Sequence, residues 1–329
     1  MRKLLAIAAM TLAPLAGAVE DRNVCIYDPL GSSGPMFGLM KDYREFALVE
    51  GYNMKLHAYT DEKIASDDFK AEQCDAVVMT GARARPFSKF ASTIEAIGAV
   101  PNDDVMRDVV MTISAPGAAK YMKTERYEVG GVIPAGAVYL FVNDRSIDTV
   151  EELSGKRIAT LDYDQPSIKM VNHVGAAVVP SNSANFSGKF NNGSVDVAYA
   201  PAIAYKPLEM YKGLGEKGGI MRYNLAYLDF QLVMHRESFG EEFGQKSRQF
   251  VSTLFDRAVK SIKHHTDEIE AHYWMDLPDE DVKKYNEMLR QVRITLRDEG
   301  VYDGTMLRLL KKLRCKSDPA AAECVENLE

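Results

Sequence analysis

The feature that most constrains the fold is an order of strands, loops and helices that occurs twice along the chain. The first copy has short apolar runs at 24–27, 54–59 and 75–79, which we predict to be strands. Between the first two runs, apolar residues at 36–47 recur at helical spacing, and Gly51 ends the pattern. This βαβαβ order is typical of a doubly wound, mostly parallel α/β sheet.

The second copy lies in the middle of the chain. It has predicted strands at 157–161 and 176–179, separated by a turn-rich loop and a helix. The segments 69–81 and 190–201 both read as helix end, turn, strand and strand-end loop, at the same offsets. We interpret the two copies as two homologous lobes.

Two strand-like segments outside the copies, 137–142 and 230–234, fall where the chain must pass between the lobes. Crossing strands there would make the second lobe an insertion in the first, hinged by two extended segments. The region 241–313 has helical periodicity and is predicted to be helical. The expected divisions of the chain are a signal peptide at 1–18, lobe 1 at 19–140 and 232–329, and lobe 2 at 141–231.

The N-terminus has the pattern of an export signal. Arg2 and Lys3 precede an apolar stretch at 4–15, and Ala16-Gly17-Ala18 forms an A-x-A cleavage site. The apolar stretch is shorter than the roughly 20 residues that span a bilayer, and no other stretch reaches that length. We therefore expect cleavage after Ala18, a periplasmic location and no membrane insertion.

Four cysteines agree with an oxidising compartment: Cys25, Cys74, Cys315 and Cys324. Four cysteines allow three pairings, which sequence alone does not separate. Proximity favours Cys315–Cys324, which leaves Cys25 and Cys74 near the starts of two predicted strands. A metal site is the other possibility, but no C-x-x-C and no histidine at ligand spacing supports it.

Charge and motifs exclude several classes of function. The 40 Lys and Arg residues against 47 Asp and Glu give a net charge of −7 without a basic stripe, so nucleic acid is not an expected partner. The chain lacks the H-E-x-x-H, G-x-S-x-G and G-x-x-x-x-G-K-[ST] motifs of metalloproteases, hydrolases and nucleotide-binding loops. These residues give no signal for an enzyme, and we expect no cofactor and no metal.

Ligands of open α/β sheets bind beyond the carboxyl ends of the strands. That rule selects the loops 27–35, 80–87, 162–167 and 199–205. The first loop leads into a helix N-terminus, whose free N–H groups suit an anion, although it could equally serve only as a tight turn. The candidate ligand-binding residues are Tyr27, Asp28, Ser32, Ser33, Thr80, Arg83, Arg85, Asp162, Tyr163, Asp164, Tyr199, Pro201 and Tyr205.

Arg83 and Arg85 are the strongest of these candidates, because a guanidinium can hold a carboxylate through two hydrogen bonds. Asp162 and Asp164 would face them from the other lobe. The arginines and acids could together hold a polar or zwitterionic ligand. They could instead form a salt bridge between lobes, or remain solvated surface charges. Core packing is the alternative role for each tyrosine.

The mature chain resembles type II periplasmic solute-binding proteins, and more narrowly the AdeT-like solute-binding family, relatives of the TRAP transporter binding proteins. The segments that carry the resemblance are 25–31, 68–75, 140–147, 161–164, 188–193, 206–213, 273–278 and 300–303. The resemblance implies a two-lobed fold with a helical C-terminal region. It also implies a monomer that captures a small polar or anionic ligand for the subunits of a membrane permease.

The sequence departs from the TRAP binding proteins at two positions. Their strand Gly-x-Lys-Ile-Arg ends in the arginine that holds the ligand carboxylate, whereas the matching stretch here places Ala159 there. Tyr199 similarly replaces the acid of their Asp-Gly-x-Glu-x-Pro loop. Either the arginine clamp has moved, to Arg83 or Arg85, or the ligand is not a simple carboxylate.

Two other functions remain open at this point. Some family members are described as efflux components linked to aminoglycoside resistance, so one alternative is an accessory protein of an envelope efflux system with a degenerate cleft. The other is an enzyme whose catalytic groups are dispersed in sequence and meet in the cleft.

Overall fold

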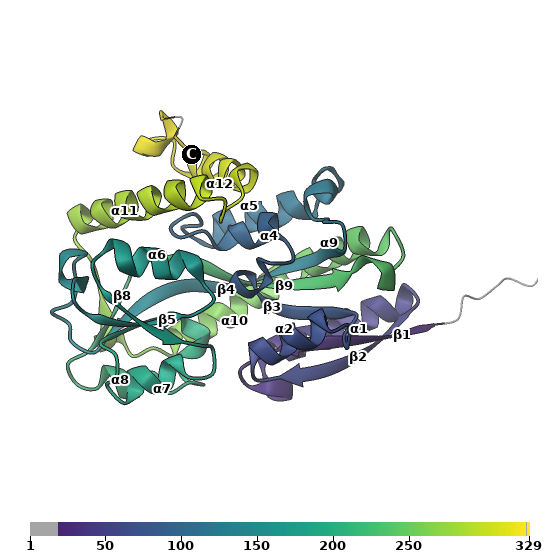
Figure 1. Ribbon diagram of the computed structural model, residues 1–329, viewed down its shortest axis with the longest axis horizontal. Helices are drawn as coiled ribbons and strands as arrows, with labels where there is room; N and C mark the ends of the chain where they lie inside the picture. Colours follow the sequence, from purple (N-terminus) through teal and green to yellow (C-terminus); the bar gives the residue numbers. More distant parts are fainter. Residues whose placement is uncertain (1–18, 327) are drawn as a thin grey trace, which may run out of the picture.

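One mixed sheet of ten strands runs through the molecule and is flanked by helices (Figure 1). The computed structural model describes residues 19–326 and 328–329, so the predicted signal peptide at 1–18 lies outside the described residues. Along the main path the strand order is β2-β1-β3-β9-β4-β7-β5-β6, and β8 and β10 extend the sheet from one end of β4. None of the helices in the described ranges has both the length and the apolar character needed to span a bilayer.

The first half of the sheet confirms the first βαβαβ copy. Its strands are β1 (Glu20–Tyr27), β2 (Tyr52–Tyr59) and β3 (Ala76–Thr80), and β1 pairs in parallel with both neighbours. The connecting helices are α1 (Pro35–Val49) and α2 (Glu62–Lys70). All five residues of β3 are buried, as expected for a central strand of a sheet covered on both faces.

The second half repeats this arrangement. Its strands are β5 (Arg157–Leu161), β6 (Ala177–Ser181) and β7 (Val197–Pro201), and β5 pairs in parallel with both β6 and β7. Its helices are α6 (Gln165–His173), α7 (Phe186–Asn191) and the short α8 (Tyr211–Leu214). The predicted doubly wound, mostly parallel α/β architecture of each half is confirmed.

Two long antiparallel strands, β4 (Tyr127–Val142) and β9 (Ala226–His235), join the halves into one sheet. They contain the strands predicted at 137–142 and 230–234. β9 also pairs with β3 of the first half, and β4 pairs with β7 of the second. Their register shifts twice, between Val129 and Gly131 and between Pro134 and Gly136, which marks β-bulges in the connection.

The C-terminal region is largely helical, as predicted, with one exception. Its helices are α9 (Phe243–Thr253), α10 (Phe255–Asp267), α11 (Asp279–Asp298) and α12 (Gly304–Ser317). The exception is β10 (Trp274–Met275), which pairs with β8 (Gly219–Met221). That pairing is long-range, so helical periodicity in the surrounding sequence does not reveal it.

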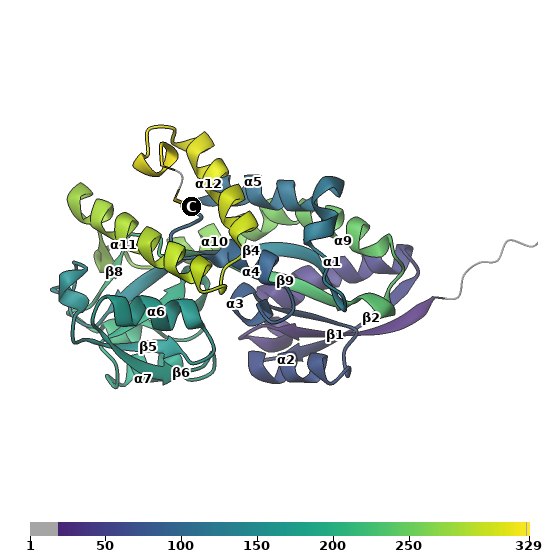
Figure 2. The same cartoon turned by 45° about the horizontal axis from the view of Figure 1, so that its top comes forward.

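Helix α11 reaches both halves of the sheet. It packs on α6 of the second half, while α12 packs on α5 (Asp103–Ser114), which leads into β4 (Figures 1 and 2). An ion pair of 2.5 Å joins Lys169 of α6 to Glu299 at the end of α11. On the other side, the Arg293 guanidinium of α11 donates to the carbonyl of Ile97.

Both disulfides that the cysteine spacing favoured are present: Cys25–Cys74 and Cys315–Cys324. Cys25 and Cys74 are buried and connect β1 to the residue pair before β3. Cys315 and Cys324 close the short loop that follows α12.

Candidate functional site

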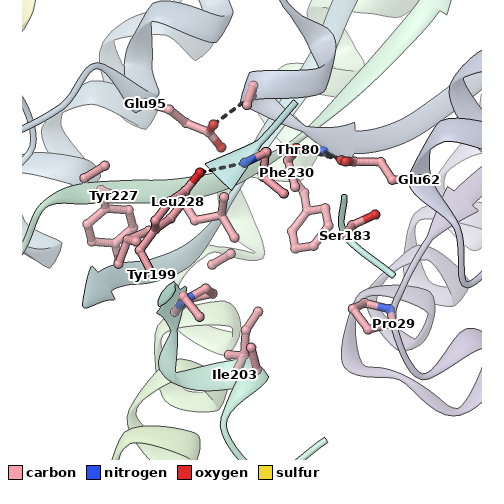
Figure 3. A pocket seen from close by; sticks show the side chains of 18 of the residues that line it. Pro29, Glu62, Thr80, Glu95, Ser183, Tyr199, Ile203, Tyr227, Leu228 and Phe230 are labelled. Atoms are coloured by element: carbon pink, nitrogen blue, oxygen red, sulfur yellow. Dashed lines mark hydrogen bonds between the residues drawn. The ribbon is translucent and has the colours of Figure 1, made fainter. Parts of the chain in front are cut away.

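A cavity of about 200 Å³ lies where the two halves of the sheet meet. Its walls come from the loops after β1, β3, β5 and β7, which are the four loops that the strand-end rule selected. The crossing strands and α10 complete the lining. In Figure 3, the side chains of Tyr199, Tyr227, Leu228 and Phe230 lie together on one side of the space, with Ile203 and Pro29 on its other sides.

Eight of the thirteen candidate residues line this cavity. They are Tyr27, Asp28, Thr80, Arg85, Tyr163, Asp164, Tyr199 and Pro201. The first four come from the first half of the sheet and the others from the second, so residues far apart in sequence face a common space.

The other five candidates lie outside the lining. Ser32, Ser33 and Asp162 are exposed, and the Ser33 hydroxyl donates to the Leu30 carbonyl. Tyr205 is fully buried in the core of the second half, where its hydroxyl donates to Glu270.

Arg83, the fifth of these residues, stacks on an aromatic ring and does not face the cavity. The centre of its guanidinium lies 3.3 Å from the ring centre of Tyr163, and its Nε atom is 3.5 Å from Glu62 Oε2. The two arginines that the sequence could not distinguish are thus in different environments.

Arg85 and Asp164 form an ion pair across the cavity. The Nη1 atom of Arg85 donates to Asp164 Oδ1 at 3.2 Å, and the Ser167 hydroxyl donates to Asp164 Oδ2. Both side chains are largely buried, with 16% and 12% of their surfaces exposed. Of the arrangements proposed for these residues, the structure contains the salt bridge between the halves.

A second contact between the halves centres on Glu62 of α2. Its Oε1 atom accepts hydrogen bonds from the backbone N–H and the hydroxyl of Thr80, while its Oε2 atom accepts one from the Tyr163 hydroxyl at 2.9 Å. Burial is the main cause that raises the pKa of Tyr163, and the negative charge of Glu62 is the second. The phenol therefore stays neutral and remains a hydrogen-bond donor.

The helix N-terminus beside the cavity is already occupied by a carboxylate of the protein. Asp28 Oδ2 accepts hydrogen bonds from the backbone N–H groups of Met36 and Phe37 in the first turn of α1, and Oδ1 accepts one from Leu30. A Cβ atom at Gly34 would collide with this carboxylate, which explains the glycine at that position. The loop thus uses its glycine for close packing, and the protein itself supplies the anion expected there.

The buried carboxyl of Glu95 fixes, through hydrogen bonds, the loop after β3 that carries Arg85. It accepts hydrogen bonds from the N–H groups of Gly81, Ala82 and Asp229, the last of which belongs to β9. A side chain at Gly81 would approach Glu95 to 2.8 Å. Glu95 therefore links the arginine-bearing loop to a crossing strand.

Asp229 is a second buried acid next to Glu95. Burial raises the pKa of Asp229 to about 8, although the hydrogen bond from Gln231 opposes this shift. Burial and the negative charge of Asp229 also raise the pKa of Glu95 well above its usual value. At the connection between the halves, the raised pKa values of these two neighbouring carboxyl groups therefore favour their protonated forms.

Sequence reasoning missed Glu62, Glu95 and Asp229. Glu62 follows Asp61 at a helix start, where acidic residues are common, so nothing marked it as facing inward. Glu95 lies in a short 3-10 turn without periodicity. Asp229 did carry a signal, because an acid inside an otherwise apolar strand requires an internal partner.

Comparisons with known proteins agree with this architecture. The profile of the family described as "Solute-binding protein AdeT 1/2" matches residues 47–329. The "Probable solute-binding protein AdeT1" of Acinetobacter baumannii is 40% identical over 304 residues, which cover 92% of this chain and all of that protein.

Among solved structures, a TRAP periplasmic solute-binding protein from Ralstonia eutropha with bound (S)-2-acetolactate matches with a TM-score of 0.74 at 12% identity. The match covers 90% of this chain and 99% of that one. A TRAP protein from Haemophilus influenzae with bound L-gulonate also has a TM-score of 0.74, at 10% identity, over 89% and 99% of the two chains. At these identities the matches show a common fold.

Proposed function

Because the chain belongs to the AdeT 1/2 family of solute-binding proteins, we propose that it captures a small ligand in the cavity between its halves and delivers it to a membrane permease. The observation that carries this proposal is the cavity of about 200 Å³, whose lining comes from both halves and is bridged by Arg85–Asp164 and Glu62–Tyr163. A ligand there contacts both halves at once, so it binds their closed arrangement more tightly than an open one.

We further propose that the halves correspond to lobe 1 at 19–140 and 232–329 and lobe 2 at 141–231, with β4 and β9 as the hinge. The pairing of these two strands between otherwise separate parallel sheets supports this division. The predicted signal peptide and the two disulfides support a periplasmic protein, which acts as a monomer.

Within the cavity, Arg85 is the residue that we propose to bind an anionic group of the ligand. Ala159 also lines the cavity, at the position where the TRAP binding proteins that the sequence resembles carry their arginine. Arg85 reaches the same cavity from the loop after β3, which supports a relocated clamp.

The efflux alternative requires a degenerate cleft. The open volume between the halves argues against it, because side chains do not fill that space. Binding without turnover distinguishes the proposal from the enzyme alternative.

The test is native mass spectrometry of the mature protein purified without refolding. We expect a mass increment from one small molecule per monomer, and the compound released on denaturation should be chemically unchanged by prolonged incubation with fresh protein. A stable protein partner together with an empty cavity would favour the efflux alternative, and conversion of the compound would favour the enzyme.

A further inference from the structure

The wall of the cavity is mainly apolar. Leu225, Leu228 and Phe230 line it from the region of β9, and Leu161, Phe186 and Ile203 line it from the second half. Leu228, Phe230 and Ile203 are labelled in Figure 3. Such a surface gains free energy when it is covered by carbon atoms, at about 25 cal/mol per Å² removed from water. A ligand that complements this wall has an apolar body.

The acidic groups that line the cavity are already engaged by the protein. Glu62 and Glu95 each accept three hydrogen bonds from protein donors, Asp28 accepts three from backbone N–H groups, and Asp164 accepts from Arg85 and Ser167. These acids are therefore not free to bind the hydroxyl groups of a polyhydroxylated ligand, and the neutral polar side chains left in the wall are few, among them Ser183, Ser261 and His265. Each hydroxyl buried without a partner costs about 1–3 kcal/mol.

Three of the four tyrosines that line the cavity offer little more. The Tyr199 hydroxyl accepts a hydrogen bond from the Leu161 N–H, Tyr227 donates to Asp103, and Tyr163 donates to Glu62. These phenols present their rings to the cavity while their polar ends are used elsewhere. The engaged carboxylates likewise leave no free ion partner for an ammonium group.

Arg85 is the exception among the charged groups of the wall. Of the described residues that line the cavity, it is the only lysine or arginine, and only its Nη1 atom is engaged. Its Nε atom is buried and has no hydrogen-bond partner among the described residues, whereas its Nη2 atom is neither buried nor engaged by them. Nη2 is therefore the part of the guanidinium that can donate a charged hydrogen bond to a carboxylate of the ligand.

The volume sets the size of the ligand. An apolar cavity of about 150 Å³ holds benzene, and this cavity is about 200 Å³. A single ring or a short branched chain with one carboxylate fills that space.

We infer that the ligand is an apolar monocarboxylate of about one ring, held by its carboxylate at Arg85, and that sugar acids are excluded. This inference rests on the proposed function. It gives the cavity a specificity different from that of the Haemophilus protein described above, whose structure contains L-gulonate.

The test is isothermal titration calorimetry of the dialysed mature protein with three probes: phenylacetate, L-gulonate and phenethylamine. The amine matches the apolar body of phenylacetate but reverses its charge. We expect phenylacetate to bind at least tenfold more tightly than L-gulonate, and phenethylamine not to bind. Leu228→Asn should weaken phenylacetate at least tenfold, whereas the matched control Leu228→Met should not.

The outcomes separate the inference from the function on which it rests. L-gulonate or phenethylamine binding as tightly as phenylacetate, or more tightly, would overturn the inference and leave a solute-binding function in place. Failure of all three probes, together with the absence of a co-purified small molecule in native mass spectrometry, would overturn both. If Leu228→Asn does not fold, Ile203→Thr against Ile203→Val provides the same comparison at another wall position.

Discussion

Arg85 and Asp164 come from opposite halves of the sheet and pair at 3.2 Å across the cavity. The same guanidinium thus bridges the two halves through Nη1, while its Nη2 atom remains unengaged by the described residues. If Arg85 binds the ligand as proposed, closure and recognition are coupled through one side chain, and changes on its two sides should have different consequences.

Removing the charge of Asp164 should favour the open arrangement. In Asp164→Asn the ion pair is lost, although the hydrogen bond from Ser167 can persist. We expect a larger radius of gyration for the ligand-free variant in small-angle X-ray scattering. Ligand affinity should fall severalfold, because the closed state that binds is less populated. Asp162→Asn is the matched control, since Asp162 is exposed, and equal radii for both variants would contradict a latch.

The two arginines should differ in their effect on affinity. Arg85→Gln removes the positive charge from the wall of the cavity. We expect at least a tenfold loss of affinity for an anionic ligand in calorimetry, since a charged hydrogen bond contributes about 1.5–3 kcal/mol. Arg83→Gln removes only the contact with Tyr163 and Glu62 and should change affinity less. An equal loss in both variants, with both folded, would contradict the assignment of Arg85.

The buried acid Asp229 should make stability depend on pH. Because its pKa is raised to about 8, the folded protein keeps a proton that the unfolded chain has already released above about pH 4. The free energy of unfolding therefore decreases as the pH rises from about 4 to about 8, and this contribution levels off above that range.

Asp229→Asn removes this ionisation. Urea denaturation at pH 5, 6.5 and 8 should show the variant gaining stability relative to the native chain as the pH increases. The folded and unfolded chains differ by at most one bound proton at this group. Over about three pH units, that difference sets an upper limit of about 4 kcal/mol on the gain in the free energy of unfolding. A stability difference that is the same at all three pH values would show that Asp229 does not hold the proton.

The two disulfides should contribute unequally to stability. Cys25–Cys74 spans 49 residues and Cys315–Cys324 spans 9. In the chain-entropy description, loops of these lengths correspond to about 4 and about 2.6 kcal/mol. We expect the double variant Cys25→Ala/Cys74→Ala to lower the free energy of urea unfolding more than Cys315→Ala/Cys324→Ala does. The reverse order would indicate that the C-terminal loop holds more of the structure than its length implies.

Local patterns in the sequence were sufficient to predict the parts of the fold that form locally. The strand at 157–161 was predicted with the bounds of β5, because a short apolar run between turn residues has few other conformations. The pairing of β10 with β8 depends on residues more than fifty positions apart, and no local pattern encodes it. The union of both halves in one sheet through β4 and β9 likewise depends on long-range pairing.

The site was predictable at the level of loops but not of side chains. A loop at the end of a strand can be assigned from strand order, but the direction of each side chain depends on packing around it. Arg83 and Arg85 illustrate this, since they are two positions apart and only Arg85 lines the cavity. Tyr205 belongs to the same predicted loop as Pro201, yet its side chain is buried in the core, where its hydroxyl donates a hydrogen bond to Glu270.

The continuity of the sheet through β4 and β9 limits how the molecule can move. Separate domains on flexible linkers could reorient freely, whereas here the hydrogen-bonded ladder between these strands must survive any change of angle. The two register shifts, at 129–131 and 134–136, are the places where the ladder is already irregular, so backbone torsion can be absorbed there with little loss of pairing. Transport competence would then depend on the backbone of β4 around these two irregularities as well as on the side chains that contact the cargo.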